Sequence, residues 1–337
     1  MKRVGFLMEQ IADVDNLRLA FYKAQKGKRG KREIIEYRNN LQQNLKLLHE
    51  KVLSGEVQVG EYHLFKIFDP KERVVCAAHF NERVLHHAIM NVCAPYFEKH
   101  FIATTYANRE NKGVYKALEL AHLATARHMF VAKLDVRKYF DTINHAVLKQ
   151  LLERLFKDKC LLQLLGKIID SYSVEEGRGL PIGNLTSQYF ANYYLSGLDH
   201  YAKEVLAVPI YIRYMDDILL FGNDRKRLQE QVNAVIYYAS ECLHLRMKSP
   251  IVQPTSIPIA FLGYRLKTNY IGLTQRSHKR FEKKYSHAVK MWDKGRWSEE
   301  MVQAHVLPLL AFVRYAYTKK YRHVILEKVE NRRGPTA

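Results

Sequence analysis

The spacing of apolar side chains predicts helices along most of the chain. In residues 9–55, Leu41, Leu45 and Leu48 recur at three- and four-residue steps, which is the period of one helical face. The same period predicts further helices over residues 81–98, 112–127, 146–156, about 184–206, 227–243 and 275–328. Residues 184–187 contain suitable N-caps for the helix that begins there.

Shorter apolar or alternating stretches predict strands at residues 61–80, 129–136, 208–224 and 259–268. The first should be a hairpin that turns at Asp69 and Pro70. The second ends at Asp135, and the third is a hairpin with Asp216 and Asp217 at its bend. This order predicts a mixed α+β fold, with a small antiparallel sheet, helices on one side of it, and an all-helical C-terminal part.

Length and composition indicate a globular protein. The 337 residues suffice for two or three subdomains, and 47% apolar residues exclude the low hydrophobicity of disordered chains. No apolar run approaches the roughly 18–20 residues that cross a bilayer, and the apolar stretch before Glu9 is too short for a signal peptide. Cys76, Cys93, Cys160 and Cys242 form no CxxC pair, so we expect buried thiols in the reducing cytoplasm and no zinc site.

The positive charge is large and unevenly distributed. The formal net charge is +20, and residues 246–337 hold 19 Lys/Arg against six Asp/Glu. Six more basic residues lie between Lys23 and Arg32. Such surfaces attract polyanions, of which nucleic-acid backbones are the usual case. The alternatives are a basic surface that serves only solubility, or an acidic membrane surface, although no amphipathic helix stands out as an anchor.

Asp135, Asp216 and Asp217 are the candidate chemical groups. A carboxylate that borders buried strands costs several kcal/mol unless it is paired or holds a metal. If the two strands are antiparallel neighbours, the three carboxylates converge. Clustered carboxylates without Cys or His favour hard divalent cations, Mg²⁺ before others, and two such ions can assist phosphoryl transfer. Taken alone, an Asp-Asp pair is ordinary turn chemistry.

The sequence around these acids resembles the reverse transcriptases. KLDVRKYFDTI at 133–143 resembles motif A of that family, and YMDD at Tyr214–Asp217 resembles the hairpin of motif C. FLGY at 261–264 is similar to the primer grip, and residues 69–89 are similar to the fingers segment that contacts the incoming triphosphate. TYANRENKGVYKAL at 105–118 resembles the segment before motif A in bacterial, intron-like enzymes.

This resemblance extends from about residue 60 to 320 and implies the right-hand polymerase fold. It implies an N-terminal extension and fingers over 1–124, a palm over 125–270 with finger-associated helices at about 144–176, and a helical thumb over 271–337. The implied activity is RNA-directed DNA synthesis from dNTPs with two Mg²⁺ ions. The basic thumb would grip the RNA/cDNA duplex through its backbone, which sets position without reading sequence.

The resemblance also assigns roles to single residues. It makes Asp135, Asp216 and Asp217 catalytic metal ligands, with Val136 beside them, and the primer grip would be Phe261, Leu262, Gly263 and Tyr264. The nucleotide-binding positions that it implies are Lys71, Arg73, Val136, Phe140, Ile182, Gly183 and Gln188. Lys71 and Arg73 would clamp the triphosphate, and Phe140 would exclude a ribonucleotide's 2′-hydroxyl.

Several of these residues have plainer interpretations. Lys71 and Arg73 could be a surface pair at a strand edge, and Phe140 could be a core aromatic. Arg83 and Arg109 correspond to basic positions of the fingers, for which surface salt bridges are the alternative. No lysine stands at the register of the motif D lysine, and Lys248 is the nearby candidate.

Motif B departs from most of the family. LPIGNLTSQ at 180–188 has Ile182 where most reverse transcriptases have a glutamine that helps hold the nascent base pair. An aliphatic side chain cannot make those hydrogen bonds. This pattern, and a compact chain without added maturase or endonuclease domain, resembles the reverse transcriptases of diversity-generating retroelements. That type implies relaxed fidelity, chiefly opposite template adenine.

The same type implies a set of partners. These are a structured template RNA, dNTPs and a small oligomeric helical accessory protein, in a bacterial or phage-encoded system and away from membranes. The cDNA would replace a variable region of a target gene. The alternatives are a retron-type or phage-defence reverse transcriptase, a group II intron maturase, and a non-enzymatic RNA-binding protein with a degenerate palm.

Overall fold

A computed structural model describes residues 3–68 and 72–330, with side chains as far as residue 327. Residues 9–55 are helical as predicted, but as four helices, α1 (Met8–Ala12), α2 (Val14–Ala24), α3 (Arg32–Asn39) and α4 (Leu41–Ser54). The breaks have local causes. Asp13 begins α2 by accepting hydrogen bonds from the N–H groups of Asp15 and Asn16, and Gly55 ends α4 with a φ of 73°.

The central sheet has four antiparallel strands in the order β4–β5–β3–β6. They are β3 (Phe130–Asp135), β4 (Ile210–Tyr214), β5 (Asp217–Gly222) and β6 (Ile251–Pro254). Successive side chains of a strand face opposite sides of a sheet. In β3, Ala132 and Leu134 therefore belong to one hydrophobic core and Val131 to the other.

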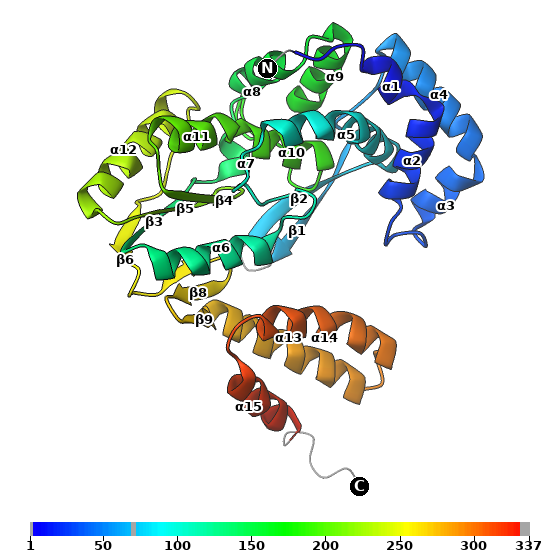
Figure 1. The fold of residues 1–337 in the computed structure, drawn as a ribbon. Coiled ribbons are helices and arrows are strands. Elements are labelled where there is room, and N and C mark those ends of the chain that lie inside the picture. Colours follow the sequence, from blue (N-terminus) through cyan, green and yellow to red (C-terminus); the bar gives the residue numbers. More distant parts are fainter. Residues whose placement is uncertain (1–2, 69–71, 331–337) are drawn as a thin grey trace.

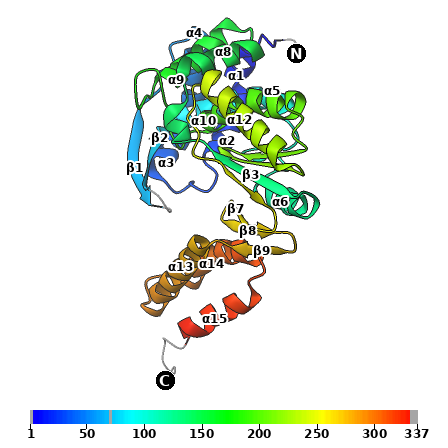
Figure 2. The same cartoon turned by 90° about the vertical axis from the view of Figure 1, so that its left-hand side faces the viewer.

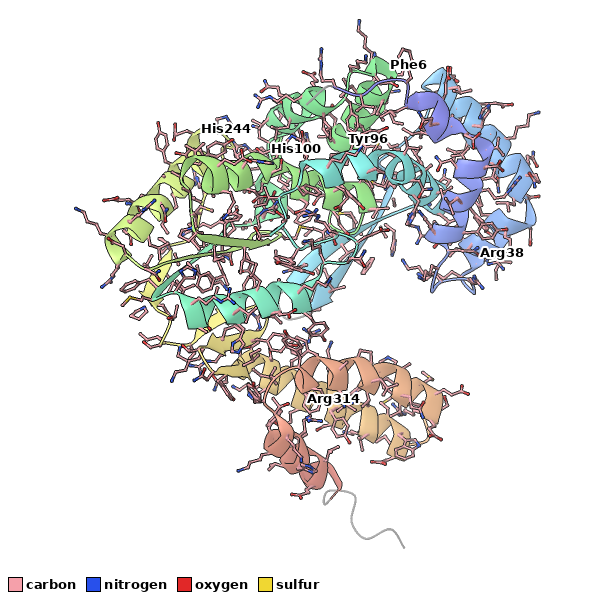
Figure 3. The ribbon with its side chains drawn as sticks, viewed as in Figure 1. Phe6, Arg38, Tyr96, His100, His244 and Arg314 are labelled. Atoms are coloured by element: carbon pink, nitrogen blue, oxygen red, sulfur yellow. The ribbon has the colours of Figure 1, made fainter. Side chains whose placement is uncertain are left out.

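Helices cover both faces of this sheet, so the expectation of helices on one side is wrong. α12 (Arg225–Glu241) packs against β3 and β5, and α6 (Val114–Arg127) lies across the opposite face on β4 and β5 (Figure 1). The first core also contains α5 (Phe80–His100) and the N-terminal helices. Side chains of the two cores fill the space between these layers (Figure 3).

The other helices of the first core follow β3 or the loop at residues 177–184. They are α7 (Tyr139–Thr142), α8 (His145–Leu155), α9 (Lys159–Asp170), α10 (Leu185–Tyr194) and α11 (Ser196–His200), with a π-helical segment at Tyr201–Val205. α10 begins where it was predicted, with Asn184 in the N-cap position, although the Asn184 side chain makes no capping hydrogen bond.

The predicted N-terminal hairpin consists of β1 (Tyr62–Phe68) and β2 (Glu72–Ala78), which pair antiparallel from Tyr62 opposite Ala78 to Phe68 opposite Glu72. Most of its side chains are exposed. The turn predicted at Asp69 and Pro70, and Lys71 beside it, lie outside the described residues.

A second small sheet and three helices form the C-terminal part, which projects from the rest of the molecule (Figure 2). The sheet contains β7 (Ile259–Phe261), β8 (Tyr264–Lys267) and β9 (Tyr270–Leu273) in sequence order. The helices are α13 (Gln275–Asp293), α14 (Glu299–Arg314) and α15 (Lys319–Glu330), so the predicted stretch 275–328 is broken twice. Tyr264, Phe281 and Val313 join these elements in the second core.

The predicted fold class, mixed α+β with small antiparallel sheets, is confirmed. None of the helices within the described ranges is long and apolar enough to cross a membrane. Cys76 and Cys93 are buried as expected, but Cys160 and Cys242 are exposed, which corrects the expectation of four buried thiols.

Candidate active site

Three carboxylates meet where two neighbouring strands end. The register of β3 with β5 places Asp135 directly opposite Asp217. In the β4–β5 hairpin Tyr214 pairs with Asp217, so Met215 and Asp216 form a two-residue turn. The structure thus brings together acids from segments that lie far apart in the sequence, as antiparallel pairing requires.

The turn that carries Asp216 has a backbone conformation that L residues rarely adopt. Met215 has a φ of 55°, and at the first turn position of such hairpins this usually requires glycine. A non-glycine residue held there costs about 1–3 kcal/mol and persists only where the surroundings fix it. The contacts of Arg213, two residues before Met215, provide that constraint.

Arg213 precedes the turn and is fully buried. Its Nε and Nη2 atoms each donate to an oxygen of buried Asp199, both at 2.6 Å, and Nη1 donates to Asn192 Oδ1 at 2.8 Å. Nη1 also donates to the Met215 carbonyl oxygen at 3.2 Å. Burial alone would lower the pKa of Arg213, but Asp199 outweighs it and the pKa is raised. The guanidinium therefore stays charged and fixes the turn through its backbone.

Residues 104–106 hold β4 from its other edge. Arg213 donates its N–H to the Thr104 carbonyl oxygen at 3.0 Å and accepts from the Tyr106 N–H at 2.9 Å, while Thr105 Oγ1 donates to Asp199 Oδ2 at 3.0 Å. Arg109 stabilises this segment through hydrogen bonds from Nη1 to the carbonyl oxygens of Ile102 and Thr105. The sequence segment before motif A is thus tied to the strand that carries the turn.

Arg83 and Arg109, for which the sequence left a salt bridge as the plainer interpretation, both form ion pairs within the chain. Arg109 Nε lies 2.8 Å from Glu98 Oε2, and Arg83 Nη2 lies 2.5 Å from Glu33 Oε1. Both arginine side chains are largely buried, at 9% and 18% exposure. The plainer interpretation, a salt bridge, therefore describes both residues, in a more buried setting than the surface pairs named as that alternative.

The carboxylates perturb one another. Burial, followed by the charges of Asp217 and Asp135, raises the pKa of Asp216 to about 6. Asp217 Oδ1 is buried and has no hydrogen-bond partner of good geometry, although Lys133 Nζ lies 3.1 Å from it as an ion pair. Lys248 Nζ donates to Asp135 Oδ1. Negative charge is thus concentrated here and offset by two lysines.

The three carboxylates supply the kind of oxygen ligand that a divalent cation prefers. Their oxygen donors converge on one edge of the sheet, the Asp217 oxygen lacks a hydrogen bond, and burial, followed by the neighbouring carboxylates, raises the pKa of Asp216. Within residues 3–68 and 72–330, however, no three such side chains stand close enough to enclose an ion. Two of the three carboxylates are instead held by Lys133 and Lys248.

Lys248 is a residue of this site that the sequence did not place. Val136, itself buried, bridges to Met247, and the Lys248 N–H donates to the Asp135 carbonyl oxygen at 2.8 Å. Further along β3, Lys133 pairs with Ile251. From the first pair to the second, β3 advances by three residues, from Val136 to Lys133, whereas the opposite strand advances by four, from Met247 to Ile251. That extra residue is a bulge next to Pro250, and it shifts the register that spacing alone would give.

The loop at residues 177–184, which contains three glycines and a proline, joins α7 to the β1–β2 hairpin. Leu180 donates its N–H to the Phe140 carbonyl oxygen at 2.8 Å, and Cys76 on β2 donates to the Ile182 carbonyl oxygen at 2.7 Å. Gly183 has a φ of 123°, and a Cβ there would lie 2.9 Å from Val75. Phe140 and Ile182 are half-buried and Gly183 is exposed, and the loop that contains Ile182 and Gly183 is hydrogen bonded to both α7 and β2.

The remaining predicted nucleotide positions are more scattered. Arg73 is exposed on β2, opposite Ile67. Gln188 is half-buried on α10, one turn after Asn184. Lys71 lies outside the described residues.

The FLGY segment is a hairpin turn held by the C-terminal helices. Leu262 and Gly263 have φ values of 48° and 89°, both positive, as the tight turn between Phe261 and Tyr264 requires. Ser277 Oγ donates to the Gly263 carbonyl oxygen at 2.7 Å, and the Tyr264 hydroxyl donates to the Phe312 carbonyl oxygen at 2.7 Å.

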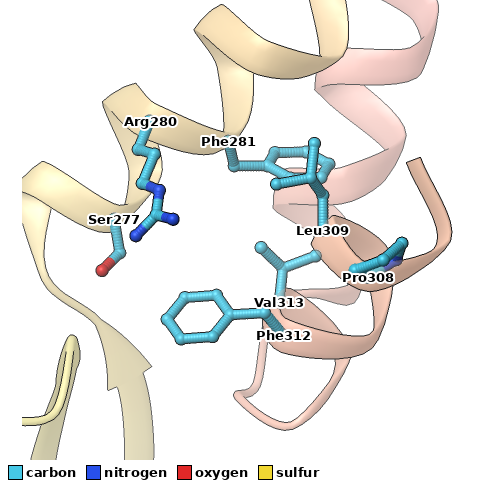
Figure 4. A pocket seen from close by; sticks show the side chains of 7 residues that line it. All are labelled: Ser277, Arg280, Phe281, Pro308, Leu309, Phe312 and Val313. Atoms are coloured by element: carbon cyan, nitrogen blue, oxygen red, sulfur yellow. The ribbon is translucent and has the colours of Figure 1, made fainter. Parts of the chain in front are cut away.

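A cavity of about 210 Å³ lies between α13 and α14 behind this turn (Figure 4). Ser277 and Arg280 supply its polar lining, and the rest is apolar, with Phe281 and Phe312 among the lining residues. The three carboxylates do not line it, so the candidate chemistry and this cavity are separate features.

Comparison with known proteins agrees with the site. Residues 69–266 match the family described as "Reverse transcriptase (RNA-dependent DNA polymerase)". Protein YkfC of Escherichia coli (strain K12) is 26% identical over 175 residues, which are 48% of this chain and 45% of that protein. The putative COX1/OXI3 intron 1 protein of Saccharomyces cerevisiae is 23% identical over 177 residues, 48% of this chain and 21% of that protein. The chain thus matches less than half the length of these relatives.

Solved structures of telomerase are also similar to this chain. Telomerase from Candida albicans, in complex with a fragment of telomeric RNA, has a TM-score of 0.47 at 15% identity. The match covers 79% of this chain and 55% of the telomerase chain. Apo telomerase from Candida tropicalis has a TM-score of 0.47 at 12% identity, and the match covers 63% of this chain and 55% of the telomerase chain.

Replacing Arg213 by Met should destabilise the protein strongly. The variant keeps the apolar stem but leaves Asp199 charged and buried without its partner, and breaking a buried ion pair costs about 3–5 kcal/mol. We expect the free energy of unfolding in urea to fall by about that amount. Arg18→Met, which removes an exposed pair with Asp15, should cost less than about 1 kcal/mol. Equal losses in the two variants would contradict this role of Arg213.

Replacing Asp216 by Asn should stabilise the cation-free protein at neutral pH. The pKa of Asp216 is raised from 3.8 to about 6. Its favourable contribution to the free energy of unfolding is therefore present below pH 4 and is lost as the pH rises through about 6. A shift of this size corresponds to at most about 3 kcal/mol. In EDTA, the variant should unfold at higher urea than wild type at pH 8, and the difference should disappear near pH 4. A difference independent of pH would exclude this explanation.

Proposed function

This chain belongs to the reverse transcriptase family, and we propose that it is an RNA-directed DNA polymerase that copies an RNA template into DNA from dNTPs. The observation that carries the proposal is the register that sets Asp135 opposite Asp217, with Asp216 in the adjoining turn. In this proposal, these carboxylates mark the point where a primer is joined to a nucleotide. The match over residues 69–266 supports the same assignment.

Each part of the site has a task in this proposal. Asp135, Asp216 and Asp217, with the backbone of Val136, would hold two Mg²⁺ ions. Bound there, such ions favour ionisation of the primer's 3′-hydroxyl and offset charge on the triphosphate. Lys248, which contacts Asp135, would give a proton to the departing pyrophosphate.

Other residues would select and orient the substrates. The ring of Phe140 would exclude a 2′-hydroxyl, and Lys71 with Arg73 would bind the triphosphate. The hairpin that contains Phe261–Tyr264 would hold the primer end against α13 and α14, to which it is hydrogen bonded. Gly183 and Gln188 would lie beside the incoming nucleotide.

We propose the division into N-terminal extension and fingers (1–124), palm (125–270) and thumb (271–337) on the same basis. The thumb contains much of the excess positive charge, which suits binding to the phosphates of an RNA/cDNA duplex. Template RNA, the RNA/cDNA duplex and dNTPs are the proposed partners, and a cytoplasmic location stays a prediction.

The finer proposal is a reverse transcriptase of a diversity-generating retroelement, with low fidelity at adenines and a small oligomeric accessory protein. Ile182 supports it, because a branched aliphatic side chain stands in the loop beside Phe140 where an amide would otherwise bond the nascent pair. A retron-type or phage-defence enzyme shares the remaining features and is the alternative.

Replacing Asp216 and Asp217 together by Asn should abolish DNA synthesis on an RNA template. The change removes two carboxylates with little change in shape, so binding of template RNA should stay near the wild-type level. Primer extension and fluorescence anisotropy measure the two properties. Asp15→Asn, an exposed acid on α2, is the matched control and should extend primers normally. Synthesis by the double variant would overturn the polymerase assignment.

Replacing Ile182 by Gln should raise fidelity opposite template adenine. One added hydrogen bond is worth about 1 kcal/mol, which corresponds to roughly a fivefold lower error rate at those positions. Sequencing of cDNA made on a defined RNA measures the error spectrum, and Ile182→Val should leave it unchanged. If the glutamine variant copies adenines as wild type does, the retroelement type is rejected and the polymerase assignment stands.

A further inference from the structure

Lys133 is a cation in the interior of the central sheet. Its strand β3 lies between β5 and β6, and alternation puts its side chain on the same face as Val131 and Asp135. The side chain is only 19% exposed. Its Nζ atom lies 3.1 Å from Asp217 Oδ1 and donates to the Ala260 carbonyl oxygen at 2.9 Å.

The two partners of this ammonium group belong to different parts of the molecule. Asp217 is one of the three converging carboxylates. Ala260 lies on β7, next to the turn at Leu262 and Gly263 that Ser277 fixes to α13. Lys133 is therefore a single side chain that contacts both the carboxylates and the hairpin.

Packing alone does not account for a lysine here. Val131 and Leu219, on the same face, are fully buried, and an apolar residue at position 133 would continue that surface without burying a charge. The charge has a local counterpart in Asp217, whose Oδ1 atom has no hydrogen bond. Lys133 thus supplies the positive charge that offsets Asp217 when no cation is bound.

We propose that Lys133 is a positioning residue that couples cation binding at Asp217 to the placement of hairpin 259–264. The inference rests on the proposed function, in which Asp217 binds a divalent cation. A cation and an ammonium group repel each other at the same oxygen, so arrival of the cation changes the hold of Lys133 on Ala260. By linkage, a primer end that fixes the hairpin changes cation affinity by the same factor.

The first measurement uses Mg²⁺ alone. Lys133→Met keeps the stem and removes the charge that competes for Asp217. Thermal unfolding of the full chain is followed against Mg²⁺ concentration without nucleic acid, and we expect the half-maximal concentration to fall roughly tenfold in the variant. Lys226→Met, an exposed lysine on α12, removes the same charge elsewhere and should match wild type. Circular dichroism establishes that both variants are folded.

The second measurement tests the coupling. The dissociation constant of a labelled RNA–DNA primer–template is measured with and without Mg²⁺, in the absence of dNTPs. The ratio of the two constants contains general screening by Mg²⁺ in every variant, so it should be the same in wild type and Lys226→Met, and it should differ from that shared value in Lys133→Met. Because both variants lose one positive charge, general screening of the duplex affects them equally.

The outcomes separate this inference from the proposed function. A Mg²⁺ response in Lys133→Met equal to that of Lys226→Met would overturn the role of Lys133, as would an unchanged ratio of dissociation constants. If wild type synthesises DNA on RNA while Lys133→Met behaves like the control, only this inference fails. If wild type neither responds to Mg²⁺ nor extends a primer, the proposed function fails as well.

Discussion

The buried pair of Arg213 and Asp199 is the constraint on which the candidate site depends. Two charges in the interior are tolerated only when each is paired and its remaining donors are satisfied. Arg213 meets this condition through Asp199, Asn192 and the Met215 carbonyl oxygen. Because the guanidinium is planar and its donors have fixed directions, it sets the direction of the backbone that leads into Met215. The unfavourable φ of Met215 follows from this constraint, and Asp216 is presented at the end of the turn.

The sequence predicted the gathering of the acids because each acid ends or interrupts a short apolar strand. It also predicted most helices, but not where they break or what they cover. Periodicity shows that one face of a helix is buried, and it carries no information about the surface that buries it. Hence α6 and α12 were expected on one side of the sheet and lie on opposite sides. β6 and β9, four residues each, were missed because their pairing partners are distant or their patterns too short.

The site residues that sequence analysis missed or named without placing act through contacts between segments. Lys248 lies beside Asp135 because a bulge next to Pro250 shifts the strand by one residue, and no spacing rule anticipates a bulge. Arg213 lies on a strand that was predicted from an apolar run, and its partner Asp199 lies on a different element, the helix α11. Lys133 lies in the motif from which Asp135 was predicted as a site residue. Its contact with Ala260 involves a hairpin 127 residues further along the chain, which the motif does not indicate.

Stability and function are opposed at this edge of the sheet. Met215 is strained and Asp216 is a carboxylate whose charge is disfavoured by burial and by its neighbours, so both reduce the stability of the cation-free fold. The lysines beside Asp135 and Asp217 offset part of that charge, and the Arg213 network fixes the strained turn. A site assembled only for packing would need neither the acids nor the lysines. Charges that remain partly exposed, held by a rigid and fully paired interior, instead suit the cation binding that we propose for this edge.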